Sequence, residues 1–571
     1  MSGLLLTSPC FVVCLLLRPI LPKSGVICAP VFITICIAAL AARWRLLWRE
    51  DNSKISPGLL IETLIISIFC GRMPLWKVHQ FWAEQDLSNL FPDVELSIDQ
   101  LNEHAYGRAL DKLAEVDLNK LISLVSLVML DIHNLDISTV HLDTTSISVE
   151  GIYDVEPYND FTINRGHSKD LRPDLKQFKI GAAVQQNGQV VMGEMLSGNK
   201  SDNKWNPEAA LKMKEFFDTQ GYRDVVFVGD CALISNESLA NLTKQHVQFI
   251  SRLPETYNLA KELKTLAWAE NSWHDIGIVS ETNSKKASHY RTYLVHHELE
   301  GHTYDFVVVH SSSLEAQKEK TLQKRIGKQK EELIKQSKGL KTKAFACEPD
   351  AQAALDVFLQ ECQRKGFEVQ GTVQICVKKS YGHRGKPRNG EEPTITTTYH
   401  AEVSVGDIKP EVYQYLLQME STFVLIANVK DRQKYDDQGI LLEYKRQISI
   451  ETKFRFLKNR VYLGPVYLEN PKRIYALGYV FILVLLLASY LEYRVRKALK
   501  ERGEAVKLPG NKSTDRPSVQ TILEVLGTIQ TVSIQGQRYF PDNVNRQALN
   551  MVRWAGFNPE EIYLKPISLN A

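Results

Sequence analysis

Two aspartates stand at positions where a carboxylate needs a partner. Asp143 lies in the run His-Leu-Asp-Thr-Thr, inside a β-branched segment that predicts a strand over residues 140–149. An ionised carboxylate in such a run is costly unless a cation or a cage of hydrogen-bond donors satisfies it. Asp230 directly follows the apolar run 225–229, and ligands gather at the carboxyl ends of strands in open α/β sheets. Each aspartate alone is a weak signal, because a single strand aspartate is more often structural.

A third group of polar residues repeats at helical spacing near the end of the chain. Tyr444, Gln447, Glu451, Arg455 and Lys458 are separated by 3, 4, 4 and 3 positions. At about 100° per residue, all five fall on one side of a helix and face a common target. A solvated face is the ordinary explanation of such a stripe. Its combination with the two aspartates favours a site in which Glu451 supplies a third carboxylate.

The composition limits the class of protein without naming a partner. The chain has 571 residues, which is too long for one compact core, and 69 Lys and Arg against 66 Asp and Glu give a net charge of only +3. A nucleic-acid partner would therefore have to be recognised by locally clustered charge. Nine cysteines without a C-x-x-C pair argue against a zinc module and a disulfide scaffold, and fit a reducing compartment.

The elements that must position these residues change in type along the chain. Residues 56–130 have helical periodicity, and Ser56-Pro57 and the capping box Ser97-x-x-Gln100 are its start signals. From there the pattern predicts strands over 140–149, 179–184, 190–196, 225–228 and 248–253, with a helix over 206–219. This order predicts an α/β layer. A mixed region follows, and a strand over 423–427 leads from it into the helix that carries the polar stripe.

Two basic segments lie in the mixed region. Residues 316–343 hold ten Lys or Arg against three Glu and predict a helix with a narrow apolar seam at Ile326, Leu333 and Leu340. A solvated helix packed on its neighbour and a phosphate-contacting face explain it equally well. The second segment predicts a loop, and its basic residues are Lys378, Lys379, His383, Arg384, Lys386 and Arg388. A phosphate clamp and an ordinary basic loop both explain this segment. Trp268 and Trp273 are expected to be core residues, with stacking on an unpaired base as the alternative.

Two apolar runs raise the alternative of a membrane protein. Residues 24–42 are uncharged and are long enough to span, but the chain start lacks the basic region of a signal peptide. Residues 475–491 are at the short limit for a span, and we predict a buried core helix there. Residues 502–516 contain Gly and Pro and predict a linker to a small C-terminal tail.

Taken together, these residues resemble the DDE transposases of bacterial insertion sequences, in the broad insertion-sequence-4-like group and most closely its insertion-sequence-1634 family. The resemblance spans about residues 57–563. It is carried by the motif around Asp143, the strand ending at Asp230 and the spacing Tyr444-x2-Gln447-x3-Glu451-x6-Lys458, together with Gly-His-Ser-Lys-Asp-Leu-Arg-Pro-Asp-Leu-Lys-Gln at 166–177 and Gly-Asn-Lys-Ser-Asp at 198–202. The run at 166–177 is the most specific of these. Gln447 departs from the group, which has Arg at that position.

The resemblance implies an α/β fold, with an RNase H-like catalytic core, a large mixed α+β insertion and an all-helical N-terminal domain. The expected division is an apolar extension at 1–48, a helical, DNA-binding domain at 49–135, the first part of the core at 136–255, the insertion at 256–420, the second part of the core at 421–500 and a C-terminal tail at 501–571. Residues 1–43 match nothing expected in this family, and we interpret them as a non-native extension.

The resemblance also implies a catalytic triad of Asp143, Asp230 and Glu451 that binds two Mg²⁺ ions, with Mn²⁺ as a substitute. All-oxygen ligands suit Mg²⁺, and two such ions promote in-line displacement at phosphorus. The residues expected to contact DNA are Tyr444, Gln447, Arg455, Lys458, Lys169, Arg172 and Lys176. The implied activity is cleavage of the element ends and joining of the 3′-OH to target DNA.

The implied partners are the terminal inverted repeats, the target DNA and a second copy of the chain. The implied location is the cytoplasm, at the nucleoid, and no membrane association is expected. An alternative interpretation is a degenerate transposase that binds DNA but no longer cuts it, which Gln447 and the unusual N-terminal segment suggest.

Overall fold

The fold is described from a computed structural model of the chain. It describes residues 55–564, except for 72, 86, 88–90, 92–93, 134–136, 280–286, 383–384, 387–389, 391, 460–465, 467, 511 and 535–536. The apolar extension expected at 1–48 therefore lies outside the described residues. The chain divides into two compact units. The first comprises Met1–Ser251, Asn428–Lys430 and Glu443–Ala571, and the second comprises Arg252–Ala427 and Asp431–Leu442.

The first unit contains five strands of a large mixed sheet. They are β1 (Thr139–Val149), β2 (Lys176–Gln185), β3 (Val190–Ser197), β4 (Val226–Gly229) and β5 (Gln248–Arg252), in the order β3-β2-β1-β4-β5. The pairs β3–β2 and β2–β1 are antiparallel, whereas β1–β4 and β4–β5 are parallel. The predicted α/β class is confirmed in this form, and the predicted strands match to within a few residues.

The first unit also contains many helices. They are α3 (Pro57–Phe69), α4 (Val78–Ala83), α6 (Glu103–Leu113), α7 (Leu118–His133), α8 (Asp202–Thr219), α9 (Asn236–Lys244), the end of α14 (Asp437–Lys445), α15 (Ile448–Lys458), α16 (Pro471–Arg502), α17 (Val519–Leu526), α18 (Arg546–Trp554) and α19 (Pro559–Tyr563). Of these, α7, α8, α15 and α16 contact the strands. The Ser56 hydroxyl caps α3 as predicted. The capping box of Ser97 and Gln100 forms, but it closes only a 3₁₀ turn, and α6 begins after Asn102, whose side chain accepts a bond from the Ala105 N–H.

Helix α16 is the apolar helix predicted from residues 475–491. By length and composition it could cross a membrane, but 89% of its most apolar window is buried inside the protein. It packs against β3, α3, α6 and α7. A Cβ added at Gly193 on β3 would lie 2.3 Å from the Ile482 side chain, so the glycine permits this close approach. The prediction of a core helix is confirmed for this segment.

The segment predicted as a linker, residues 502–516, is folded against the first unit's core. Residues 506–514 form a hairpin of β12 (Val506–Leu508) and β13 (Lys512–Thr514), and a second hairpin joins β14 (Val532–Ile534) to β15 (Gln537–Tyr539). Helix α18 packs on α16, and the Trp554 indole donates a hydrogen bond to Glu504 at 2.7 Å. The linker prediction is wrong because Val506 is buried and joins the same apolar core as α16.

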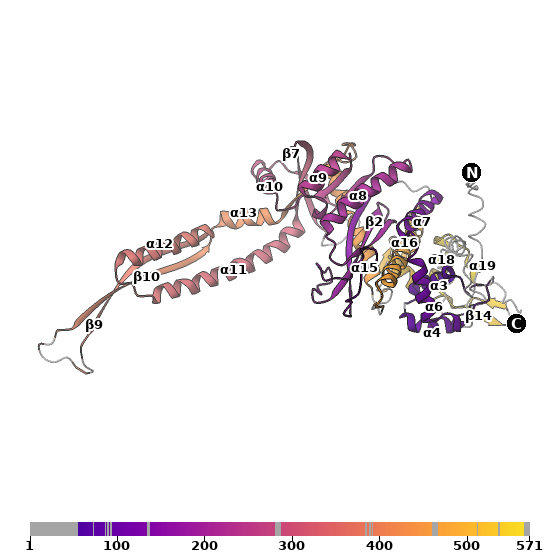
Figure 1. Ribbon diagram of the computed structural model, residues 1–571. Helices are drawn as coiled ribbons and strands as arrows, with labels where there is room; N and C mark the ends of the chain where they lie inside the picture. The colour runs from indigo at the N-terminus through magenta and orange to yellow at the C-terminus, as the bar shows by residue number, and fades with distance from the viewer. Residues whose placement is uncertain are drawn as a thin grey trace. The chain divides into compact units, whose positions relative to one another are not determined.

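The second unit combines a group of antiparallel strands with an elongated arm. The strands are β6 (His274–Ile278), β7 (His289–Leu299), β8 (His302–Ser311) and β11 (Thr422–Asn428), and the other elements are α10 (Asn258–Glu270), α11 (Ser312–Thr342), α12 (Glu348–Arg364), β9 (Phe367–Ser380), β10 (Thr394–Ile408) and α13 (Pro410–Glu420). Helices α11 and α12 lie along the paired strands β9 and β10 (Figure 1). The seam predicted on the basic helix packs here: Leu333 is fully buried, and Ile326 and Leu340 contact the same cluster.

Two other features of the second unit correct or refine the sequence analysis. Lys378 and Lys379 end strand β9 rather than lying in a loop, whereas His383, Arg384 and Arg388 fall outside the described residues. Trp268 and Trp273 pack edge to face at 5.1 Å between ring centroids. The Trp268 indole donates to the Thr422 hydroxyl at 3.0 Å. These contacts favour the expected packing role over base stacking.

Candidate active site

Asp143 is half-buried in the middle of β1. Strand β1 pairs with the antiparallel strand β2, and in this register Asp143 lies directly opposite Ala182. Its Oδ1 atom accepts a bond from the backbone N–H of Thr144 at 2.7 Å and one from the Lys169 ammonium at 2.8 Å. The sequence predicted that a cation or hydrogen-bond donors would satisfy this carboxylate. The backbone N–H of Thr144 and the ammonium group of Lys169 do so.

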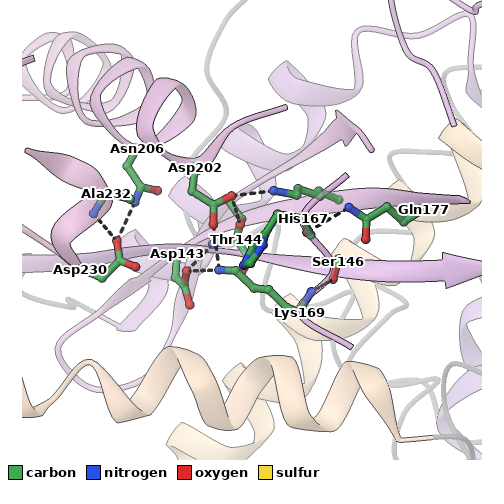
Figure 2. A network of polar contacts seen from close by, with 11 residues as sticks. Asp143, Thr144, Ser146, His167, Lys169, Gln177, Asp202, Asn206, Asp230 and Ala232 are labelled. Atoms are coloured by element: carbon green, nitrogen blue, oxygen red, sulfur yellow. Dashed lines mark hydrogen bonds and ion pairs between the residues drawn. The ribbon is translucent and has the colours of Figure 1, made fainter. Parts of the chain in front are cut away.

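Lys169 connects two carboxylates from different elements (Figure 2). Its ammonium lies 2.8 Å from Asp143 Oδ1, 3.1 Å from Asp202 Oδ2 and 2.7 Å from the carbonyl oxygen of Thr144. Burial acts to lower the pKa of Lys169, but the two aspartates outweigh it, so the pKa lies above its ordinary value. Lys169 is therefore protonated, and each of its three N–H groups has an acceptor.

Asp202 is a functional candidate that the sequence analysis did not single out. It is the first residue of α8, where a carboxylate is stabilised by the helix N-terminus. It accepts bonds from the Thr144 hydroxyl at 2.7 Å and from Lys179, a buried residue of β2, at 2.9 Å. Burial acts to raise the pKa of Asp202, but Lys169, Lys179 and Thr144 together bring it below its ordinary value. Its place in the Gly-Asn-Lys-Ser-Asp motif was the one available signal.

Asp230 lies at the end of β4, the strand parallel to β1. One carboxylate oxygen accepts bonds from the Ala232 N–H at 3.0 Å and from the Asn206 amide at 3.3 Å. Burial, followed by the negative charge of Asp143, raises the pKa of Asp230 above its ordinary value. Figure 2 shows Asp230 and Asp143 on neighbouring strands, with Lys169 bonded to Asp143 and not to Asp230. Asp143 and Asp202 each bond to a lysine, whereas Asp230 bonds to none among the residues that the structure describes.

Glu451 lies on α15, which packs against β1, β2 and α16. Its side chain is exposed on this helix. Within the described residues, no three His, Cys, Asp or Glu side chains are grouped so as to hold a metal ion. The structure thus places the two aspartates together and Glu451 on an adjacent helix.

The predicted continuous helix of the polar stripe is interrupted. Helix α14 ends at Lys445 and α15 begins at Ile448, so Tyr444 and Gln447 do not share a helix with the rest. The N–H groups at 446, 447, 449 and 450 bond to carbonyls three residues earlier, which tightens the chain into 3₁₀ geometry. The prediction of one uninterrupted stripe is therefore wrong, although neither Pro nor Gly marks the break.

The remaining predicted DNA contacts have partners of different kinds. Lys458 forms an ion pair with Asp170, next to Lys169, and so ties α15 to the loop at 166–175. Arg172 is exposed and pairs with Asp174, and Lys176 donates to the carbonyl oxygen of Tyr153 at 3.0 Å. Arg455 is exposed on α15. Of the basic residues expected to contact DNA, Lys169 is the one that bonds to Asp143 and Asp202.

A buried network that the sequence did not reveal fixes the end of α14 to β1. Glu443 Oε1 lies 3.0 Å from His141 Nε2 and accepts the Thr139 hydroxyl at 2.7 Å, while Arg446 bonds its second oxygen at 2.6 Å. Burial acts to raise the pKa of Glu443, but His141, Thr139 and Arg446 lower it to about 2. Because His141 and Asp143 are two residues apart on one strand, the network positions α14 beside the site.

Replacing Glu443 with glutamine is expected to remove a pH-dependent part of the stability. The folded-state pKa is depressed, so the contribution is complete above the ordinary value of 4.5 and is lost as the pH falls toward 2. It amounts to about 3 kcal/mol. Urea unfolding of wild type and Glu443→Gln at several pH values should show a stability difference that shrinks between pH 6 and pH 3. A difference that stays constant over this range would contradict the assignment.

Comparisons with known proteins add a domain match and two distant structural similarities. Residues 37–127 match the model of DUF4277, a domain of unknown function. No curated protein matches the chain. Among solved structures, a piggyBac transposase synaptic complex with hairpin DNA is similar with a TM-score of 0.33 and 9% identity, over 86% of this chain and 76% of that one. The Mos1 transposase paired-end complex with the left transposon end has a TM-score of 0.14 and 11% identity, over 37% and 66%.

Proposed function

We propose that this chain is a DNA transposase that cleaves the ends of an insertion sequence and joins the freed 3′-OH to target DNA. The observation that carries the proposal is the pair of aspartates on β1 and at the end of the parallel strand β4, of which Asp230 is half-buried beside the charge of Asp143 and bonds to no lysine among the described residues. Two carboxylates held this way attract a hard divalent cation. The motif resemblance and the strand order β3-β2-β1-β4-β5 support an RNase H-like core of the insertion-sequence-4-like group.

In this proposal Asp143, Asp230 and Glu451 hold two Mg²⁺ ions, or Mn²⁺ in their place. When bound, such ions would activate the attacking oxygen and stabilise the leaving oxygen of the phosphodiester. Lys169 adds a fixed positive charge for the phosphate, and Asp202 and Thr144 hold it in position. Asn206 and the Ala232 N–H orient the Asp230 carboxylate. Lys458 and Tyr444 are the proposed contacts to the backbone phosphates near the scissile bond.

The proposed substrates are the element's terminal inverted repeats and a target duplex, bound by two copies of the chain in the cytoplasm, at the nucleoid. The test is incubation of the purified protein with a plasmid that carries the DNA flanking its gene. We expect Mg²⁺-dependent nicks at the element ends, which EDTA abolishes and added Mg²⁺ restores. Cleavage that persists in EDTA, or occurs with no preference for the ends, would contradict the proposal.

The second candidate is a transposase relic that binds DNA without cutting it. Gln447 supports this reading, because a neutral amide replaces the arginine of the group at the turn between α14 and α15. The plasmid assay separates the candidates, since a relic retains the protein on the element ends but leaves both strands intact.

A further inference from the structure

Helix α11 carries two classes of basic residue that differ in their surroundings. Three are paired with acids of neighbouring elements in the same unit: Arg325 with Glu420, Lys330 with Asp407 and Lys341 with Glu402. Five others are exposed and have no ion pair or hydrogen bond from their ammonium groups within the described residues; these are Lys320, Lys324, Lys328, Lys335 and Lys338. Packing and ion pairing within the unit therefore explain the first class and leave the second unexplained.

The five lysines share one side of the helix. At 100° per residue they fall within a sector of about 80°, opposite the side on which Leu322 and Leu333 are buried. One acid, Glu331, lies in the same sector. Lys320 and Lys338 are 18 positions apart, which is about 27 Å at the rise of an α-helix. That length approaches one turn of B-DNA, which is about 34 Å.

Two glycines lie on this part of the helix, near the lysine stripe. Gly327 and Gly339 lie in the interior of α11, where glycine is unfavourable for a helix, and a Cβ built at either position meets no atom within 4 Å. Packing inside the protein therefore does not require them. A glycine on an open helix face does permit an external backbone to approach closely.

We propose that this lysine stripe of α11 binds the phosphate backbone of duplex DNA. The inference rests on the proposed function and deepens it, because it assigns the second unit a surface for the DNA duplex beyond the cleavage site. Unpaired ammonium groups in a row neutralise successive phosphates and release counterions. Such contacts hold the duplex without reading its sequence. Figure 1 shows α11 as a long helix of the arm, with β10 running alongside it.

The test measures binding rather than cleavage, so that it does not depend on the active site. The full chain is titrated in EDTA with a fluorescent 40-base-pair duplex at several salt concentrations. In one variant all five stripe lysines become glutamine, which preserves helix propensity. In the control, Lys120, Lys244, Lys261, Lys500 and Lys512 become glutamine; these are also exposed, and their ammonium groups have no ion pair in the described part of the chain. Both variants change the net charge equally.

We expect the stripe variant to lower the slope of log affinity against log salt by about 4, since each phosphate contact contributes about 0.9. The control should change the slope by less than about 1. Gly327→Leu should weaken binding at unchanged charge. An equal loss in both five-fold variants, no loss in the stripe variant, or preferential binding of single-stranded RNA would overturn the proposal. If wild type cleaves plasmid DNA and the stripe variant binds DNA normally, only this inference is contradicted. If the stripe variant binds DNA more weakly but wild type does not cleave it, only the proposed cleavage activity is contradicted.

Discussion

Asp143→Asn and Asp230→Asn are each expected to lower the rate of Mg²⁺-dependent strand cleavage by about 10³-fold. The amide keeps the shape of the side chain but removes the charge that, under the proposed function, would hold a divalent cation. A bound ion supplies several kcal/mol of charge stabilisation in the transition state, and each 1.36 kcal/mol corresponds to a factor of ten. Single-turnover cleavage of a labelled element end measures the effect, with the protein in excess.

Three comparisons make this result interpretable. Asp218→Asn, which changes an exposed aspartate paired with Lys214 on α8, should cleave as wild type does. Both active-site variants should still bind the DNA in EDTA, which shows that they are folded. Glu451→Gln tests the third carboxylate separately, and a rate close to that of wild type would remove Glu451 from the site while leaving the aspartates in it. Cleavage by Asp143→Asn at the wild-type rate would contradict the assignment of the catalytic carboxylates.

The largest effect on stability is expected from a buried ion pair between α15 and α16. The Lys453 ammonium lies 2.9 Å from Glu492, and the two side chains are 4% and 3% exposed. Burial lowers the pKa of Lys453, and Glu492 opposes this shift. Glu492→Leu leaves Lys453 as a buried cation beside Arg496, which also pairs with Glu492. The free energy of unfolding should fall by about 3–5 kcal/mol.

The double variant Lys453→Met/Glu492→Leu should recover most of this loss, because apolar side chains of similar volume replace both charges. Glu208→Gln, which breaks an exposed pair with Lys200, is the matched control and should cost less than about 1 kcal/mol. Hydrogen exchange at the α15 and α16 amides reports this unit specifically, since a chain of two units need not unfold in one step. A double variant less stable than Glu492→Leu would show that the pair is not the cause.

The sequence predicted those parts of the site that depend on local pattern. Asp143 and Asp230 were identifiable because each stands in or after an apolar run of strand character, and α16 because of its uninterrupted apolar length. The contacts of Lys169 were not identifiable. Its approach to Asp202 joins residues 33 positions apart, and it depends on where the loop at 166–175 crosses β1, which no periodicity encodes.

Other failures have equally specific reasons. The break between α14 and α15 contains no Pro or Gly, and the buried bonds of Glu443 to His141 and Thr139, about 300 positions away, fix the end of α14 there. The segment after α16 contains the glycine and proline typical of linkers, yet tertiary packing of Val506 orders it. In both cases long-range packing outweighed local propensity.

The ion pairs of Lys169 have a consequence for the charge of the site in the protein alone. Three aspartates and two lysines, Lys169 and Lys179, share the site, so its net charge is close to −1 and most of the mutual repulsion is already cancelled. Folding therefore does not have to wait for a metal, unlike folding of a site built from carboxylates alone. Under the proposed function, a divalent ion bound at Oδ1 of Asp143 would compete with the ammonium group of Lys169, which already bonds to that atom. The resting protein would then hold metal weakly, and a DNA phosphate that paired with Lys169 would make metal binding at Asp143 more favourable.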